Sequence, residues 1–289
     1  MINYQKYREE FDSFLDENGE IAIGSNFSMF PSQILLGLDE TAYDEQLRDY
    51  VDQKKSDYSL IVYQNFPAPI AYFYQQAELA FDNDNHRLQL LRSTWESVIF
   101  ILYALILGEV NHRRFDLKDV RIFDGKKIKH DHNGIMSDRL GWKVEAMQKI
   151  IEFDQENDNQ LVISSYINSD VFEIIKGLNH ERNSFSHIAA LTPSEARQRF
   201  EEIYPEVSDL LFELDFLENV SLIRFATTLG HMSKIRFNRF DGHSLQKQNY
   251  DKLLSASELT TYSLILSDEI LLMEFDSILF NVSPFIHFQ

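Results

Sequence analysis

The feature that most constrains this chain is a long apolar helical pattern over residues 85–110. Apolar residues recur there at spacings of three and four and so share one face of a helix. They are Leu88, Leu91, Trp95, Val98, Leu102 and Leu105. The most apolar stretch, 98–106, is shorter than the roughly 20 residues that a membrane span needs. We therefore expect the core helix of a globular domain, with no membrane partner.

More helices are expected after this one. Leu140, Val144, Met147 and Ile151 have helical spacing, and so do Val171, Ile174, Ile175 and Leu178, after capping side chains at 168–170. Thr192-Pro193-Ser194-Glu195 has the residues of a capping box with proline at the first helical position. The helix that it opens contains Pro205, which is expected to kink or split it.

The two ends of the chain have a different pattern. Residues 1–66 predict a short acidic helix at 5–16 and strands at 21–23 and 60–63, followed by a proline-rich break at 66–69. Beyond residue 219, the patterns predict antiparallel strands that include 234–237, 261–266, 270–275 and 277–282, with Asp241-Gly242 as a hairpin turn. The predicted fold is mainly α, with small β-containing N- and C-terminal segments. The predicted divisions are 1–66, 67–218 and 219–289.

The charge balance limits the choice of partners. The net charge is −19, and an acidic surface repels nucleic acid unless a local basic patch overcomes the overall field. Residues 111–133 contain such a patch, and we take Arg113, Arg114, Lys126, Lys127 and Lys129 as candidate RNA-binding residues, with an ordinary solvated loop as the alternative. The chain has no cysteine, which excludes disulfides, thiolate metal sites and a cysteine nucleophile.

The segment Arg182-Asn183-Ser184-Phe185-Ser186-His187 has the residue types for cleaving RNA. On a helix, Asn183 and His187 lie on one face and Arg182 lies one step around it. When the 2′-hydroxyl of RNA attacks its own phosphodiester, histidine can carry the proton near neutral pH. Arginine can stabilise the charge that builds on the phosphate, and Asn183 can support either group. We therefore take Arg182, His187 and Asn183 as the candidate catalytic residues.

This segment resembles the Arg-x4–6-His signature of the HEPN superfamily, including the asparagine after the arginine. The resemblance implies a HEPN-like helical bundle over residues 67–218. It also implies a cytoplasmic, metal-independent endoribonuclease without a cofactor, acting as a homodimer in which two motifs line one cleft. Toxin–antitoxin and phage-defence systems contain such proteins, so the resemblance implies RNA as the substrate and an antitoxin or regulatory protein as a partner.

Some alternatives stay open at this stage. Glu96 and His180 are candidate supporting residues, Glu96 by orienting Arg182 across the bundle; simple exposure is the alternative for both. The alternative for the motif itself is that Arg182 pairs locally with Glu181 or Glu202 while His187 caps a helix end. His130-Asp131-His132 lacks an obvious third ligand, and no metal site is expected there. The competing functions are a non-catalytic HEPN-like dimerisation or partner-binding module and a nucleotide-sensing protein.

Overall fold

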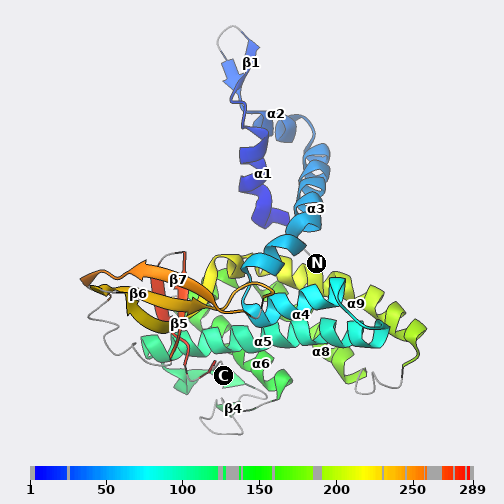
Figure 1. Ribbon diagram of the computed structural model, residues 1–289. Coiled ribbons are helices and arrows are strands. Elements are labelled where there is room, and N and C mark those ends of the chain that lie inside the picture. Colours follow the sequence, from blue (N-terminus) through cyan, green and yellow to red (C-terminus); the bar gives the residue numbers. More distant parts are fainter. Residues whose placement is uncertain are drawn as a thin grey trace. The chain divides into compact units, whose positions relative to one another are not determined.

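The computed structural model describes residues 4–24, 27–122, 126–127, 137, 139–157, 160–184, 191–229, 231–244, 246–256, 258, 269–275, 277–283 and 285–286. These residues are mostly helical with small sheets, which confirms the mainly α prediction. They belong to two compact units, Met1–Leu60 and Ile61–Gln289. The helices that follow residue 67 and the larger sheet both lie in the second unit (Figure 1).

The first unit consists of short elements around an aromatic core. It contains a 3₁₀ turn η1 (Tyr4–Tyr7), α1 (Arg8–Leu15), strands β1 (Ile21–Gly24) and β2 (Phe27–Met29), α2 (Pro31–Leu38) and most of α3 (Glu40–Asn65). The Phe11 ring of α1 meets the Tyr43 ring of α3 edge-on, with centroids 5.3 Å apart. The Tyr43 hydroxyl also donates to Asp12 at 2.6 Å, so aromatic packing and a polar contact together join the two helices.

The predicted strand at 60–63 is wrong, because these residues are the last turns of α3. The buried residues of α3 keep helical spacing along its length: Tyr43, Leu47, Val51, Tyr58 and Val62. Val62 and its neighbour Tyr63 are both buried, which a half-buried strand with alternating faces would not allow. The break at Pro67 is present, since α3 ends at Asn65 and α4 (Ala68–Leu79) follows.

The second unit is built around α5 (Asp84–Arg113), which contacts α4, α6 (Leu140–Glu156), α7 (Val162–Tyr166), α8 (Ser169–Ser184) and α9 (Pro193–Glu213) (Figure 1). All six apolar residues of the predicted stripe on α5 have an exposed fraction of 0%. Burying a large apolar side chain contributes about 1.5–3 kcal/mol relative to leaving it exposed. The stripe is therefore a main source of stability for this unit.

The start of α9 has the predicted capping box, with reciprocal hydrogen bonds between Thr192 and Glu195. Pro205 does not split the helix, which runs without interruption to Glu213. Buried Ile203 and Val207 lie on either side of the proline, so packing on the apolar face continues across it. At this position the packing outweighs the missing backbone N–H.

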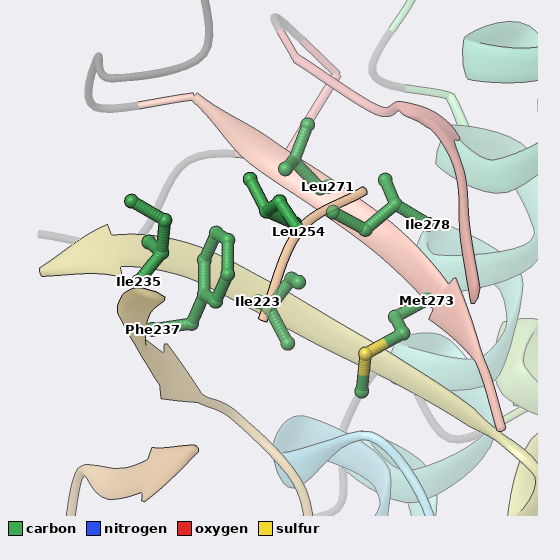
Figure 2. Packing of buried hydrophobic residues seen from close by; sticks show 7 residues of the cluster. All are labelled: Ile223, Ile235, Phe237, Leu254, Leu271, Met273 and Ile278. Atoms are coloured by element: carbon green, nitrogen blue, oxygen red, sulfur yellow. The ribbon is translucent and has the colours of Figure 1, made fainter. Parts of the chain in front are cut away.

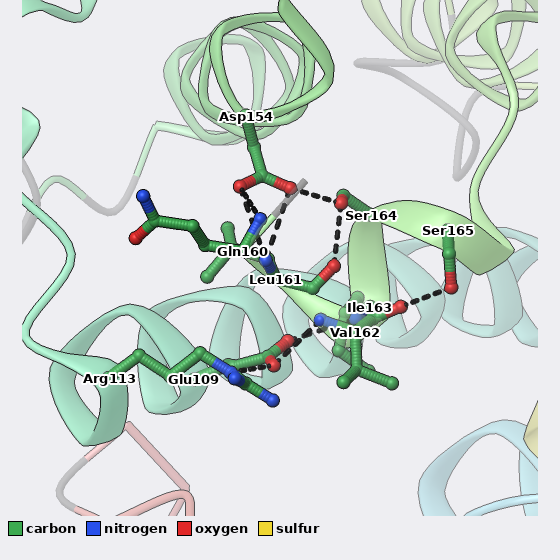
Figure 3. Close-up of polar contacts among 9 residues, drawn as sticks. All are labelled: Glu109, Arg113, Asp154, Gln160, Leu161, Val162, Ile163, Ser164 and Ser165. Carbon is green, nitrogen blue, oxygen red and sulfur yellow. Dashed lines mark hydrogen bonds and ion pairs between the residues drawn. The ribbon is translucent and has the colours of Figure 1, made fainter. Parts of the chain in front are cut away.

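Two buried carboxylates fix the turn before α7 (Figure 3). Glu109 of α5 accepts the backbone N–H groups of Val162 at 2.7 Å and Ile163 at 2.9 Å. Asp154 of α6 accepts those of Gln160 at 2.7 Å and Leu161 at 3.1 Å. Both carboxylates have an exposed fraction of 0%, and each satisfies N–H groups that a helix start leaves without partners.

The region after α9 begins with the 3₁₀ turn η4 (Asp215–Glu218) and forms an antiparallel sheet with the strand order β7-β6-β5-β8-β9. The strands are β5 (Val220–Leu229), β6 (His231–Arg239), β7 (Gln248–Leu253), β8 (Ile270–Glu274) and β9 (Ser277–Asn281). Antiparallel strands were predicted here, and the expected strand at 261–266 lies outside the described residues. A Cβ on Gly108 would lie 3.0 Å from the Cα of Val282, so this glycine allows the sheet to approach α5 closely.

One face of this sheet carries a separate apolar cluster (Figure 2). It consists of Ile223, Ile235, Phe237, Leu254, Leu271, Met273 and Ile278, which come from four strands and the segment after β7. Phe225 and Tyr250 pack against its margin. The sheet is therefore stabilised by an apolar cluster of its own in addition to its contact with α5.

Asp241-Gly242 does not form the predicted two-residue turn, because Arg239 pairs with Gln248 and a longer loop joins β6 to β7. This loop instead binds the junction between α3 and α4. The backbone N–H of Gly242 donates to the carbonyl of Phe66 at 2.8 Å, and that of His243 donates to Tyr63 at 2.7 Å. Gly242 has φ of +74°, which favours glycine.

The position of α5 bears on the membrane prediction. Among the described residues it is the one helix long and apolar enough to cross a membrane, so the expectation of a stretch too short to span is wrong. However, 72% of its most apolar window is buried within the protein, as expected of a core helix. The predicted divisions at 66/67 and 218/219 stay predictions; both positions fall inside the second compact unit.

Candidate functional site

The arginine of the motif lies in the last turn of α8. The side chain of Asn168 accepts the N–H of Val171 at 3.1 Å and so caps the start of this helix, as its sequence predicts. Val171, Ile175 and Leu178 are each fully buried. Arg182 lies four residues after Leu178, on the same side of the helix, where the buried face meets solvent. Its side chain is 36% exposed.

The partner of Arg182 is Glu96 of α5. The Nε of Arg182 donates to Oε1 of Glu96 at 2.8 Å, joining residues 86 positions apart in the chain. Glu96 lies beside fully buried Trp95, and its own side chain is 23% exposed. The structure thus brings together Arg182 and the acidic residue proposed to orient it, while the role of the pair stays a prediction.

The alternative was a local pairing of Arg182 with Glu181 or Glu202, whereas the structure shows a contact of Arg182 with Glu96. Glu202 instead accepts hydrogen bonds from Arg199 and Gln198, one turn away on α9. A local pair would use an exposed carboxylate and leave the arginine able to move with the helix end. The contact with Glu96 ties the end of α8 to the core helix instead.

A second arginine reaches the same carboxylate oxygen, and sequence reasoning missed it. The Nε of Arg92 donates to Oε1 of Glu96 at 2.9 Å, and the Arg92 side chain is 25% exposed. Arg92 and Glu96 are four apart on α5, a spacing that places oppositely charged residues together on a helix. That spacing was the signal in the sequence. We call Arg92, Glu96 and Arg182 the Arg-Glu-Arg cluster.

The other motif residues are placed only in part. His180 is exposed on α8. The backbone of Asn183 is in the last turn of α8, and its side chain is outside the description, as is the whole of His187. Both described flanks of the segment 185–190 contact the first half of α5, through Arg182 on one side and Leu191 on the other. The Leu191 carbonyl accepts from Asn85 at 3.1 Å.

Arg113 and Arg114, two of the candidate RNA-binding residues, lie at the far end of α5 from the Arg-Glu-Arg cluster. Arg113 donates to buried Glu109 at 2.6 Å, and Arg114 ends α5 with φ of 55°. Glu96 and Arg113 are separated by most of α5, which at 1.5 Å per residue places them about 25 Å apart along the helix. The structure therefore separates Arg113 of the predicted basic patch from the contact between Arg182 and Glu96.

The rest of the basic segment is short and only partly described. A 3₁₀ turn η2 (Leu117–Asp119) precedes β3 (Arg121–Ile122), which pairs with β4 (Lys126–Lys127). Lys127 is exposed. Lys129 and the segment His130-Asp131-His132 lie outside the described residues. Within the part of the chain that is described, no three His, Asp or Glu side chains gather into a possible metal site.

The geometry defines a class of protein in general terms. It is a mostly helical protein with an accessory antiparallel sheet and a partly exposed arginine–glutamate–arginine cluster between two helices of its core. Comparison with known proteins gives no match to a protein-family model, to a curated protein or to a solved structure.

Proposed function

We propose that this protein is a metal-independent endoribonuclease of the HEPN type. The observation that carries the proposal is the 2.8 Å hydrogen bond from Arg182 to Glu96, together with the Arg182-Asn183-(three residues)-His187 spacing. A guanidinium has five N–H donors. Glu96 engages the Nε of Arg182, and a side chain that is 36% exposed has donors to offer a phosphate. A guanidinium held in this way is preorganised to stabilise a phosphate on which charge is building.

In the proposed reaction the 2′-hydroxyl of a ribose attacks the adjacent phosphorus and loses its proton. The bond from phosphorus to the 5′-oxygen breaks, and that oxygen gains a proton. The products are a 2′,3′-cyclic phosphate and a 5′-hydroxyl. His187 takes or supplies a proton, Arg182 stabilises the charge on the phosphate, and Asn183 supports them. No step in this reaction requires a metal ion.

Local charge supports RNA as the substrate despite the overall acidity. The protein has a net charge of −19, but the Arg-Glu-Arg cluster contains two cations and one anion. A second copy of the chain, with its motif in the same cleft, would double this positive charge, which is why a homodimer is part of the proposal. Cytoplasmic location, a toxin or phage-defence role and a restraining partner protein are further parts of it.

The test is incubation of the purified protein with total RNA in the presence of EDTA. We expect cutting by the wild type, and loss of about 10³-fold in rate on replacing Arg182 by glutamine, the upper range for removing one stabilising donor. Arg197→Gln is the matched control, because Arg197 also pairs with a carboxylate but is 64% exposed and lies on α9. Undiminished cutting by a folded Arg182→Gln, His187→Ala double variant would refute the assignment.

A second function is favoured by the charge itself. A net charge of −19 suits a protein-binding module that avoids nucleic acid better than it suits a nuclease. In that case the wild type would cut no RNA under any condition tested. If an oligonucleotide raised the melting temperature without being cut, the result would indicate a nucleotide-sensing protein instead.

A further inference from the structure

Two arginines from different helices converge on one carboxylate oxygen in the Arg-Glu-Arg cluster. Arg92 donates to Oε1 of Glu96 at 2.9 Å and Arg182 donates to the same oxygen at 2.8 Å. Their Nε atoms can therefore lie no further apart than the sum of these two distances, 5.7 Å. The two side chains are 25% and 36% exposed, so both lie partly in contact with solvent.

One carboxylate neutralises only one of these two cations. Two guanidinium groups this close repel each other, and a further anion beside them would relieve the repulsion. If Arg92 served only to stabilise α5, a pair with Glu96 would suffice, and such a helical pair contributes only about 0.3–0.5 kcal/mol. The convergence of Arg92 with the motif arginine on one oxygen is better explained by an anionic ligand.

We propose that Arg92 and Arg182 form a two-arginine clamp on a single phosphate group of the RNA, which makes Arg92 a further catalytic residue. This inference rests on the proposed function for its ligand. Arginine suits the role because its planar fork matches the oxygens of a phosphate. Each guanidinium takes one of the two non-bridging oxygens of the scissile phosphate, and Glu96 fixes the angle between the two forks. As the 2′-oxygen attacks, charge grows on both oxygens, and each already has its own donor.

The first test measures binding without cleavage. A fluorescent RNA oligonucleotide with 2′-O-methyl groups cannot attack its own backbone, so its Kd reports the clamp alone. We expect Arg92→Gln to raise the Kd by at least about tenfold, the loss of one charge-assisted hydrogen bond. Arg197→Gln, which removes an arginine outside the cluster, is expected to leave the Kd within about twofold. Equal Kd values for the two variants would overturn the clamp, and so would a wild type that does not bind.

The second test identifies the atom that Arg92 contacts. Replacing one non-bridging oxygen at a defined cleavage site by sulfur gives two diastereomers, and each places sulfur against one of the two arginines of the clamp. We expect wild type to cut both diastereomers more slowly than the all-oxygen RNA. Arg92→Gln should lose this slowing for one diastereomer and keep it for the other, while Arg92→Lys keeps the charge and recovers part of the rate. A purely structural role for Arg92 would lower the melting temperature and leave both sulfur effects unchanged, which would contradict the proposal.

The two tests separate the clamp from the nuclease activity. One outcome is that wild type binds the 2′-O-methyl RNA, that Arg92→Gln weakens this binding, and that wild type cuts no RNA. This outcome would support the clamp and contradict the ribonuclease activity. The other outcome is that wild type cuts RNA and that Arg92→Gln binds and cuts RNA equally well. This outcome would support the ribonuclease activity and contradict the clamp.

Discussion

The carboxylate of Glu109, fully buried near the end of α5, accepts the backbone N–H of Val162 at 2.7 Å. It also accepts the N–H of Ile163, so replacing it with alanine leaves two N–H groups without acceptors. A buried polar group left without a partner costs about 1–3 kcal/mol. We expect Glu109→Ala to lower the free energy of unfolding by about 3 kcal/mol, measured by urea denaturation. Glu173→Ala is the control, because Glu173 forms an exposed pair with Lys176. Equal losses in the two variants would contradict the prediction.

The loop after β6 depends on Gly242. A Cβ there would lie 2.9 Å from the backbone oxygen of Gln64, and the φ of +74° strains any other residue. We expect Gly242→Ala to lower the free energy of unfolding by about 2 kcal/mol. Gly177 gives a control of opposite sign, since it lies inside α8 and its Cβ would make only ordinary contact. Gly177→Ala should gain up to about 1 kcal/mol, and a gain in both variants would refute the strain at Gly242.

The capping box of α9 gives a prediction that depends on pH. Thr192→Ala should lower the free energy of unfolding by about 1 kcal/mol, whereas Ser194→Ala should change it little. Hydrogen bonds from Thr192 hold the pKa of the Glu195 carboxyl below its ordinary value of 4.5. A lowered folded-state pKa stabilises the protein above pH 4.5 and loses that effect as pH falls. The difference between wild type and Thr192→Ala should shrink in acid, and a difference that grows in acid would contradict this account.

For Asp241 we expect the opposite dependence of stability on pH. Burial raises the pKa of its carboxyl above the ordinary 3.8, and the pairing with Arg239 opposes that shift without cancelling it. As pH rises from 3.8 to the raised pKa, the unfolded chain releases this proton while the folded chain keeps it, so stability falls. Asn at this position does not titrate. Urea denaturation at several pH values should show this decline in wild type and a weaker one in Asp241→Asn; identical slopes would refute the prediction.

The helical core was predictable from the sequence because its signals are local. The stripe on α5, the Asn168 cap and the Thr192 capping box each depend on residues within one or two turns, and the structure has all three. The prediction of a strand at 60–63 was wrong for a related reason. Four apolar residues in a row do not distinguish a strand from the buried end of a long helix, and their helical spacing appears only together with Leu47 and Val51.

The candidate site was only partly predictable because it depends on contacts between distant segments. The motif marks Arg182 by itself, but its contact with Glu96 joins α5 to α8. The only sequence signal for Arg92 was its position four residues before Glu96 on a helix, and many surface pairs have the same spacing. Arg113, at the start of the basic segment, ends the same helix that carries Glu96 yet lies about 25 Å from it along the axis, because an α-helix rises about 1.5 Å per residue.

The close approach of Gly108 to Val282 has a practical consequence for anyone who wishes to study the helices alone. A shortened chain ending at residue 218 would lose β9 and uncover the apolar second half of α5, where Leu105, Ile106 and Leu107 are otherwise shielded from water. Such a fragment is expected to self-associate. Aggregation of such a fragment would therefore say nothing about the role of the sheet in the whole protein.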